Sequence, residues 1–187
     1  MRAWVLVGGV YDRSVSVAKV AVVPTWEAWR AFLKKCAKNN APSTKKLGWA
    51  AFFSTVGDGA TKLDALSVTT TNAIVLDLDD VGRQWADDPD APSKTVDEVV
   101  QLATQALAPI GFGWWETWQS RQDRVRLRIV VPLAQPIHPS LAAREWTRLA
   151  TLLRDHGIPW PDKTSQEATR LNLLPTTRGR WGVIEGA

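Results

Sequence analysis

Residues 73–80, AIVLDLDD, form a short apolar run that ends in closely spaced carboxylates. Side chains alternate between the two faces of a β-strand. The alternation predicts that Val75, Asp77 and Asp79 share one face, with the Cα atoms of the two aspartates about 7 Å apart, and that the other apolar side chains enter a core. Two anions held side by side need cations. Protons or arginines could balance them, and so could Mg²⁺ or Mn²⁺, which prefer oxygen ligands. The alternative is a strand that runs into a solvated, aspartate-rich turn.

The pattern of the whole chain predicts a mixed α/β (α+β) fold. Apolar side chains recur at helical spacing in three stretches, at about residues 25–38, 96–107 and 140–155. Strand-like runs occupy about residues 3–7, 47–54, 73–79, 112–118, 125–131 and 170–175, of which the fourth and fifth are expected to form a β-hairpin. No internal repeat or low-complexity linker is present, so we expect a single domain over residues 1–187.

A second strand carries arginines on one face. Along residues 124–129, Arg124, Arg126 and Arg128 alternate with apolar side chains. Guanidinium groups fit phosphate bidentately and stay charged near neutral pH. If this strand lies beside Asp77, its arginines would flank a metal-bound triphosphate. Nucleotidyl transfer needs such an arrangement because negative charge gathers on oxygens in its transition state. The competing interpretation is the solvated face of an amphipathic strand.

A third carboxylate is a weaker candidate. Asp162 lies in a proline-rich turn, residues 157–163, and Arg170 follows at the start of another strand-like run. Loop aspartates are common, so Asp162 gains weight only in combination with the aspartate pair.

The charge of the chain suits a polyanionic partner. The formal net charge is +4 and the sequence pI is ≈ 9.5. One group of lysines is the expected contact for a single-stranded DNA template: Lys34, Lys35, Lys38, Lys45 and Lys46. The chain also has 11 tryptophans, whose rings can stack on bases, although most are expected in the core.

Cysteine content and hydropathy exclude several classes of protein. The single cysteine, Cys36, cannot form an intrachain disulfide, and cysteines and histidines are too few for a structural zinc site. The apolar residues 3–10 are too short to span a membrane and lack a signal-peptide cleavage pattern. These features predict a cytosolic protein without a membrane partner.

Taken in this order, the motifs resemble the archaeo-eukaryotic primase superfamily, in particular the primase-polymerase domains of phage and plasmid replication proteins. The resemblance covers about residues 49–175. Its motifs are the Asp77-Leu78-Asp79 pair after a hydrophobic strand, the run RIVVPL at residues 128–133 followed by Gln135-Pro136, and Asp162 followed by RLNLLP at residues 170–175. The order and spacing of the motifs carry the resemblance, since each motif alone is weak.

The resemblance implies a largely antiparallel sheet flanked by helices, with the RRM-like core of a primase-polymerase. It implies a DNA primase and DNA polymerase of phage or plasmid replication that uses nucleoside triphosphates on a single-stranded DNA template. Asp77, Asp79 and Asp162 would hold two divalent ions, Mg²⁺ or Mn²⁺. The nucleotide-binding arginines would be Arg128, Arg126 and Arg170. The chain would work in the cytoplasm of a bacterial or archaeal host, as a short protein or as a domain excised from a replication protein with a helical accessory domain or a replicative helicase.

The sequence departs from the superfamily at its second motif. Many members carry Ser-x-His there, whereas the matching positions here are Arg126-Leu127-Arg128. Arginine can neutralise phosphate but does not reproduce the histidine contact. Many primases also have a zinc-binding element, for which this chain lacks the cysteines.

Two other classes of function stay open at this point. A non-catalytic module that binds single-stranded DNA or a replication origin would use arginines and tryptophans equally well. Paired aspartates on one face disfavour that class, because they repel a phosphate backbone unless a metal intervenes. A rolling-circle nicking enzyme needs a tyrosine nucleophile and a histidine-bound metal. Tyr11 is the only tyrosine, and His138 and His156 do not form a paired motif.

Overall fold

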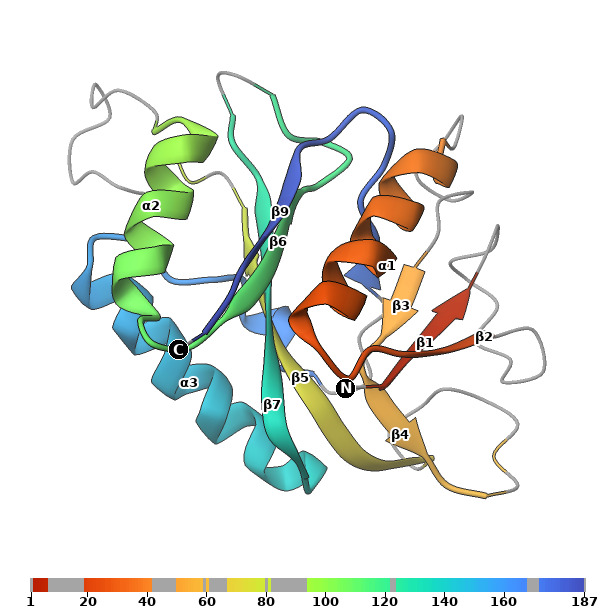
Figure 1. The fold of residues 1–187 in the computed structure, drawn as a ribbon. Helices are drawn as coiled ribbons and strands as arrows, with labels where there is room; N and C mark the ends of the chain where they lie inside the picture. The colour runs from red at the N-terminus through yellow and green to blue at the C-terminus, as the bar shows by residue number, and fades with distance from the viewer. Residues whose placement is uncertain are drawn as a thin grey trace.

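The computed structural model describes residues 2–6, 19–41, 50–58, 60, 67–79, 81, 94–121, 124–167 and 172–186. Their strands form two sheets (Figure 1). The larger sheet, in spatial order, contains β4 (Ser54–Val56), β5 (Val68–Leu78), β7 (Leu127–Ile137), β6 (Phe112–Glu116) and β9 (Trp181–Ile184). The smaller sheet contains β2 (Lys19–Val22), β1 (Arg2–Leu6), β3 (Ala50–Phe52) and β8 (Asn172–Leu173). All pairings between these strands are antiparallel, which confirms the expected mixed α/β fold with a largely antiparallel sheet.

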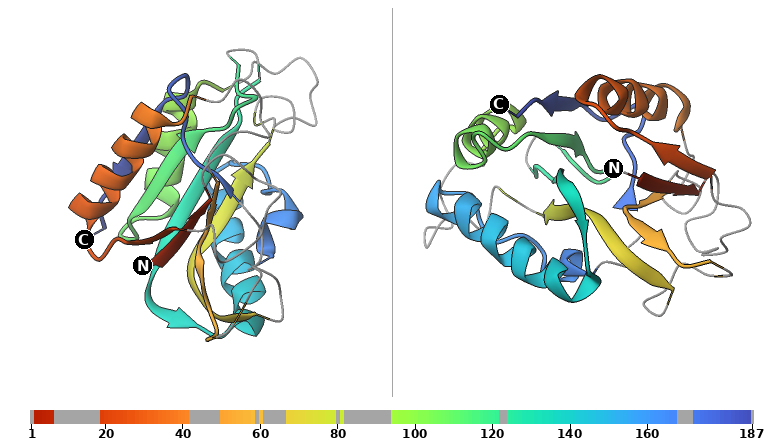
Figure 2. Two further views of the ribbon diagram at one scale, coloured as in Figure 1. Left: turned by 90° about the vertical axis from the view of Figure 1, so that its right-hand side faces the viewer. Right: turned by 60° about the horizontal axis from the view of Figure 1, so that its bottom comes forward.

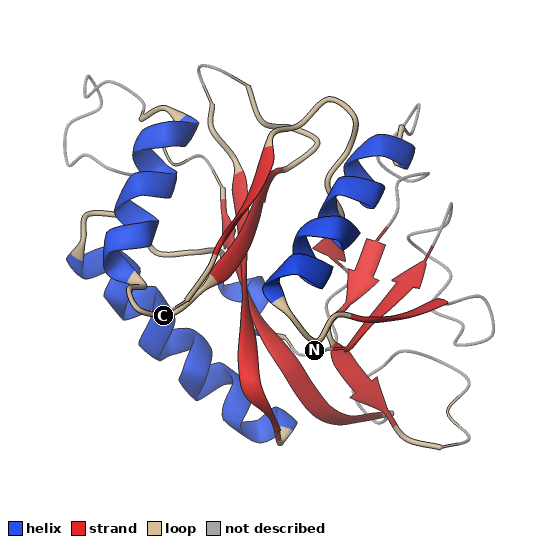
Figure 3. Ribbon diagram, viewed as in Figure 1, coloured by secondary structure: helices blue, strands red, loops and turns tan. Residues whose placement is uncertain are grey.

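Three α-helices flank the sheets (Figure 3): α1 (Trp26–Asn39), α2 (Val96–Ala106) and α3 (Pro139–Asp155). Each begins or ends at a residue suited to that position. Thr25 caps α1, and Thr95 with Glu98 forms a reciprocal capping box on α2. Gly157 follows α3 with φ 77°, a left-handed conformation that glycine adopts without strain. The three helices lie where their apolar periodicity predicts them.

The larger sheet separates two apolar cores. On one face, Leu76 and Ile129 pack with Trp146 of α3. On the opposite face, Val75 and Val130 pack with Trp29 of α1. Figure 2 shows α1 and α3 on opposite sides of this sheet. The alternation predicted for both strands is therefore confirmed. No helix within the described ranges is long and apolar enough to cross a membrane.

The strands differ from the sequence prediction mainly at the sheet edges. The edge strands β2 and β9 were not predicted, because short edge strands form through backbone pairing with a neighbour and need no strong pattern of their own. Of the run 47–54, residues 47–49 lie outside the described residues, and the rest lies in two strands, β3 and β4, with Phe53 between them. Of the run 170–175, only β8 is a strand, and residues 170 and 171 lie outside the described residues.

Antiparallel pairing brings together one end of each of four strands of the larger sheet. Asp77 near the end of β5 lies opposite Arg128 near the start of β7, and Arg128 lies opposite Trp115 near the end of β6. Trp115 in turn lies opposite Trp181 at the start of β9. We refer to this end of the larger sheet as the carboxylate end, because Asp77 and Asp79 lie there.

Candidate active site

A buried ion pair occupies the carboxylate end. Arg128 Nη2 donates a hydrogen bond to Asp77 Oδ2, directly across the β5–β7 ladder. The two residues are only 6% and 3% exposed, respectively. Both lie on the face that carries Val75 and Val130, as the alternation predicts, but Arg128 is not on a solvated face. Taking two charges out of water is costly, so this pair is stable only while each partner keeps the other.

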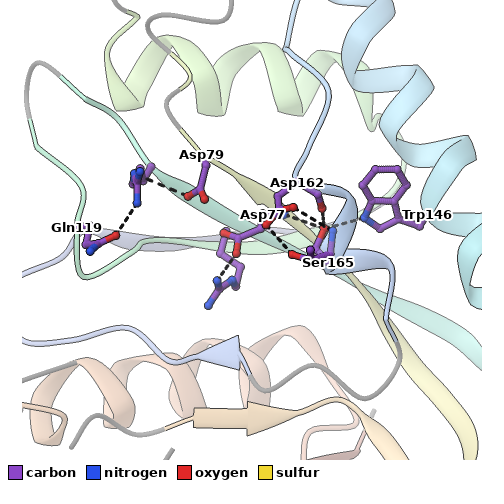
Figure 4. A network of polar contacts seen from close by, with 9 residues as sticks. Asp77, Asp79, Gln119, Trp146, Asp162 and Ser165 are labelled. Carbon is purple, nitrogen blue, oxygen red and sulfur yellow. Dashed lines mark hydrogen bonds and ion pairs between the residues drawn. The ribbon is translucent and has the colours of Figure 1, made fainter. Parts of the chain in front are cut away.

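A second arginine–aspartate contact lies just beyond the end of β5 and just before the start of β7. Asp79 follows the last residue of β5, and its side chain is 41% exposed. The Nε of Arg126 lies 3.8 Å from Asp79 Oδ1, and the Nη1 of the same arginine donates to Gln119 Oε1. Figure 4 shows Asp79 between Gln119 on one side and Asp77 and Asp162 on the other. Each aspartate of the pair therefore has its own arginine on the neighbouring segment.

Asp162 reaches the same place from the other side of β5. Its backbone N–H donates to the carbonyl oxygen of Asp77 at 2.8 Å. Its carboxylate caps the short 3₁₀-helix η3 (Lys163–Gln166) by accepting from the backbone N–H of Thr164 at 3.0 Å and from its hydroxyl at 2.6 Å. The structure thus brings the three aspartates that the motifs singled out to the same end of the sheet.

Ser165 and Trp146 hold this segment in place, and neither was singled out from the sequence. The Ser165 hydroxyl donates to the carbonyl oxygen of Asp162 at 2.6 Å and accepts from Trp146 Nε1 at 2.9 Å and from the Asp77 N–H at 3.4 Å. Trp146 reads as an ordinary apolar residue of a helix, and a serine in a turn carries no distinctive signal. No spacing rule in the sequence predicts this network.

The carboxylates repel one another. Partial burial raises the pKa of Asp79 most, and the neighbouring charge of Asp77 raises it further. The guanidinium groups of Arg126 and Arg128 lower it, and Asp162 adds a smaller increase. The net shift of the Asp79 pKa is upward, and burial is its largest cause. A cation bound beside Asp79 would favour its charged form.

The donor set fits a hard divalent cation, but the side chains are oriented toward other partners. Within the described ranges, no three carboxylate, imidazole or thiol groups are arranged to hold a metal ion as they stand. The carboxylate of Asp77 faces Arg128, and that of Asp162 faces Thr164. Oxygen ligands with uncompensated negative charge suit Mg²⁺ or Mn²⁺. Binding would require these carboxylates to exchange their present partners.

The chain's only thiol takes no part in this chemistry. Cys36 is buried in α1, and burial raises the pKa of its thiol to about 12. Because a thiolate is the nucleophilic form, Cys36 is unreactive near neutral pH.

The other predicted binding residues fall in two groups. Lys34, Lys35 and Lys38 are exposed on α1, whose end is held to the segment before β9 because Asn40 Nδ2 donates to the carbonyl oxygens of Leu174 and Pro175. The remaining three, Arg170, Lys45 and Lys46, lie outside the described residues. Roles in nucleotide or template binding stay predictions for both groups.

No protein-family model matches the sequence, and no curated protein matches it. Among solved structures, the chain is similar to the AEP domain of the primase-polymerase (PrimPol) of cyanophage S-2L, with a TM-score of 0.47 and 13% sequence identity. The match covers 100% of this chain and 80% of that one. A functional assignment for this chain therefore depends on the geometry of its own site.

Proposed function

We propose that this chain is a metal-dependent nucleotidyltransferase, a DNA primase and DNA polymerase that acts in phage or plasmid replication. The observation that carries the proposal is the convergence of Asp77, Asp79 and Asp162 at one end of the sheet, with Arg126 and Arg128 beside them. Carboxylates next to arginines match the needs of phosphoryl chemistry, in which charge gathers on oxygens. The order of motifs that resembles primase-polymerases supports the same assignment.

Each side chain then has a role. The three aspartates would hold Mg²⁺ or Mn²⁺, which when bound would activate the primer 3′-hydroxyl for in-line attack and stabilise the leaving pyrophosphate. Arg128 and Arg126 would bind the phosphates of the incoming nucleoside triphosphate, together with Arg170. Because both described arginines now contact the aspartates, nucleotide binding would transfer the guanidinium groups from carboxylate to phosphate oxygens. Arg128→Ala should therefore weaken nucleotide binding more than template binding.

The positive charge of the chain points to a nucleic-acid partner. A single-stranded DNA template would contact the lysines of α1 and of the segment after it, with an affinity that falls as salt rises. The resemblance to primase-polymerases suggests that a replicative helicase or a helical accessory domain would act with this domain, in the cytoplasm of a bacterial or archaeal host.

A non-catalytic module that binds single-stranded DNA or a replication origin is the second candidate. The observation in its favour is the buried ion pair between Asp77 and Arg128, which can serve a structural role without any metal. The aspartate pair argues against it, because Asp77 and Asp79 would repel a phosphate backbone unless a metal ion lay between them.

The test is incorporation of labelled nucleotides on a single-stranded template, with and without a primer, in Mg²⁺ or Mn²⁺. The proposal predicts products that match the template and depend on the metal. Products without a primer would make the chain a primase. Strand binding without any synthesis, under all of these conditions, would instead favour the binding module.

A further inference from the structure

Trp118 differs from the other tryptophans whose side chains the structure describes. Those others belong to one of the two apolar cores or pack against it: Trp26, Trp29, Trp114, Trp115, Trp146, Trp160 and Trp181. Trp118 does neither. It is half-buried in the loop between β6 and β7, and the guanidinium of Arg178 lies over its ring, 5.4 Å from the centroid. The core does not account for this ring, and an aromatic face beside a guanidinium can stack a nucleic-acid base.

Two loops hold this pair at the carboxylate end. The loop from β8 to β9 is fixed to the end of β6, because the Arg180 N–H donates to Glu116 Oε2 at 2.7 Å and the Glu116 N–H donates to the Arg180 carbonyl oxygen at 2.9 Å. The loop after β6 is fixed by Ser120, whose N–H donates to the Thr117 carbonyl oxygen at 3.0 Å. The pair therefore sits on an ordered surface.

The same loops are next to the proposed catalytic carboxylates. Gln119, the neighbour of Trp118, accepts from Arg126, and Arg126 lies 3.8 Å from Asp79. Residues 117–126 contain three arginines and one aspartate, and residues 174–181 contain two arginines and no acidic residue. Arg121 is exposed at the tip of the first loop. A polyanion bound to this surface would extend toward the proposed catalytic carboxylates.

We propose that Trp118 and Arg178 form a stacking platform for single-stranded nucleic acid at the entrance to the carboxylate site. A base stacks on the indole or on the guanidinium plane, and Arg121 and Arg178 contact the phosphates. The ligand is a single strand because bases inside a duplex are already stacked on one another and do not offer a free face. The identification of this strand as the template rests on the proposed function.

A second cation–π pair provides the matched control. Arg154 lies over Trp160 at 5.3 Å, but that indole also packs edge-on against Trp146 in the core. Arg154 lies at the end of α3, with a side chain that is 60% exposed. Removing Arg154 deletes the same charge and the same type of contact, away from the two loops.

The experiment is fluorescence anisotropy of a labelled oligothymidine, and of the same strand with abasic sites, without metal or nucleotide. Trp118→Ala should weaken binding of the normal strand by roughly fivefold to a hundredfold. Trp118→Phe should retain most of the affinity. The abasic strand should bind the wild-type chain and Trp118→Ala alike. Arg178→Ala should reduce the slope of log affinity against log salt by about 0.7, and Arg154→Ala should not.

Two results would overturn the platform: wild-type affinity in Trp118→Ala, or equal losses on the normal and the abasic strand. Failure of the platform and failure of the proposed function are distinguishable. Metal-dependent synthesis with unchanged strand binding by Trp118→Ala would reject the platform alone. Base-dependent binding through Trp118 in a chain that never incorporates nucleotides would reject the polymerase alone.

Discussion

The buried pair between Asp77 and Arg128 determines which cation lies beside the Asp77 carboxylate when no ligand is bound. A carboxylate that is 3% exposed needs a cation beside it, and the guanidinium meets that need in this structure. A divalent ion would meet it equally well and would leave Arg128 able to bind phosphate. Under the proposed function, the ion pair would compete with metal binding, and a bound metal would release Arg128 to bind phosphate.

Replacing Arg128 should reveal whether Asp77 is a metal ligand. Arg128→Ala leaves the buried carboxylate without its guanidinium and should lower the free energy of unfolding by about 3–5 kcal/mol. Mn²⁺ should restore part of this loss, because the ion can replace the guanidinium. Chemical denaturation with and without Mn²⁺ measures both effects.

The control for this measurement is Arg30→Ala. Arg30 pairs with Glu185 at 2.7 Å on the surface, with both side chains 50% exposed. Losing that pair should cost at most about 1 kcal/mol, and Mn²⁺ should not reverse the loss. If Mn²⁺ stabilises Arg128→Ala no more than Arg30→Ala, Asp77 is a structural residue.

Removing the charge of Asp79 should stabilise the folded chain. Its pKa is raised above 3.8 in the folded chain, so as the pH rises the unfolded chain loses this proton first and the folded state becomes less stable. Near neutral pH, Asp79→Asn should therefore unfold at a higher temperature than the wild type. The gain should stay below about 1 kcal/mol because the side chain is 41% exposed, and solvent screens it.

Thermal denaturation over a range of pH tests this sign. The difference between Asp79→Asn and the wild type should shrink as the pH falls through 3.8, because below that pH the carboxyl becomes protonated in the unfolded state as well as in the folded state. A variant that is less stable than the wild type at neutral pH would mean that the contact with Arg126 outweighs burial and repulsion.

At the scale of the elements, the side-chain pattern predicts β5 and β7 well. Residues 71–78 of β5 and 127–131 of β7 are buried, and their apolar side chains fit one core or the other, so the period of two is preserved there. The helices were predictable because apolar side chains recur at helical spacing, and Thr25 and Thr95 mark the starts of α1 and α2. The edge strand β9 was not, since its pairing with Phe112 to Trp115 depends on the fold as a whole.

The packing of α1 on the sheet depends on one glycine of β6. A Cβ at Gly113 would overlap the indole of Trp29, which is 1% exposed. Gly113→Ala should lower the free energy of unfolding by about 1–3 kcal/mol, because the ring is enclosed and cannot move aside. Gly57→Ala is the matched control, because its Cβ would lie 3.3 Å from the flexible Thr69 Cγ2. Equal losses in the two variants, measured by chemical denaturation, would contradict this packing.

At the scale of the whole molecule, the site joins segments that are distant in the sequence. Asp77 and Asp79 could be singled out from the end of one strand, and Arg126 and Arg128 from the alternation of another. The register that pairs Asp77 with Arg128 could not be predicted from the sequence. Strand periodicity defines the face on which a side chain lies but not its partner on the neighbouring strand. The position of Asp162 depends on hydrogen bonds through Ser165, which no local pattern encodes.

The most direct test of the central claim compares two aspartate variants on a primed single-stranded template in Mn²⁺. Asp79→Asn should reduce the rate of nucleotide incorporation by at least about a hundredfold, because it removes a charge where the reaction needs a metal. Asp155→Asn, which alters an aspartate whose side chain is 58% exposed at the end of α3, should incorporate at the wild-type rate. Incorporation by Asp79→Asn at the rate of Asp155→Asn would contradict the assignment of these carboxylates as the catalytic site.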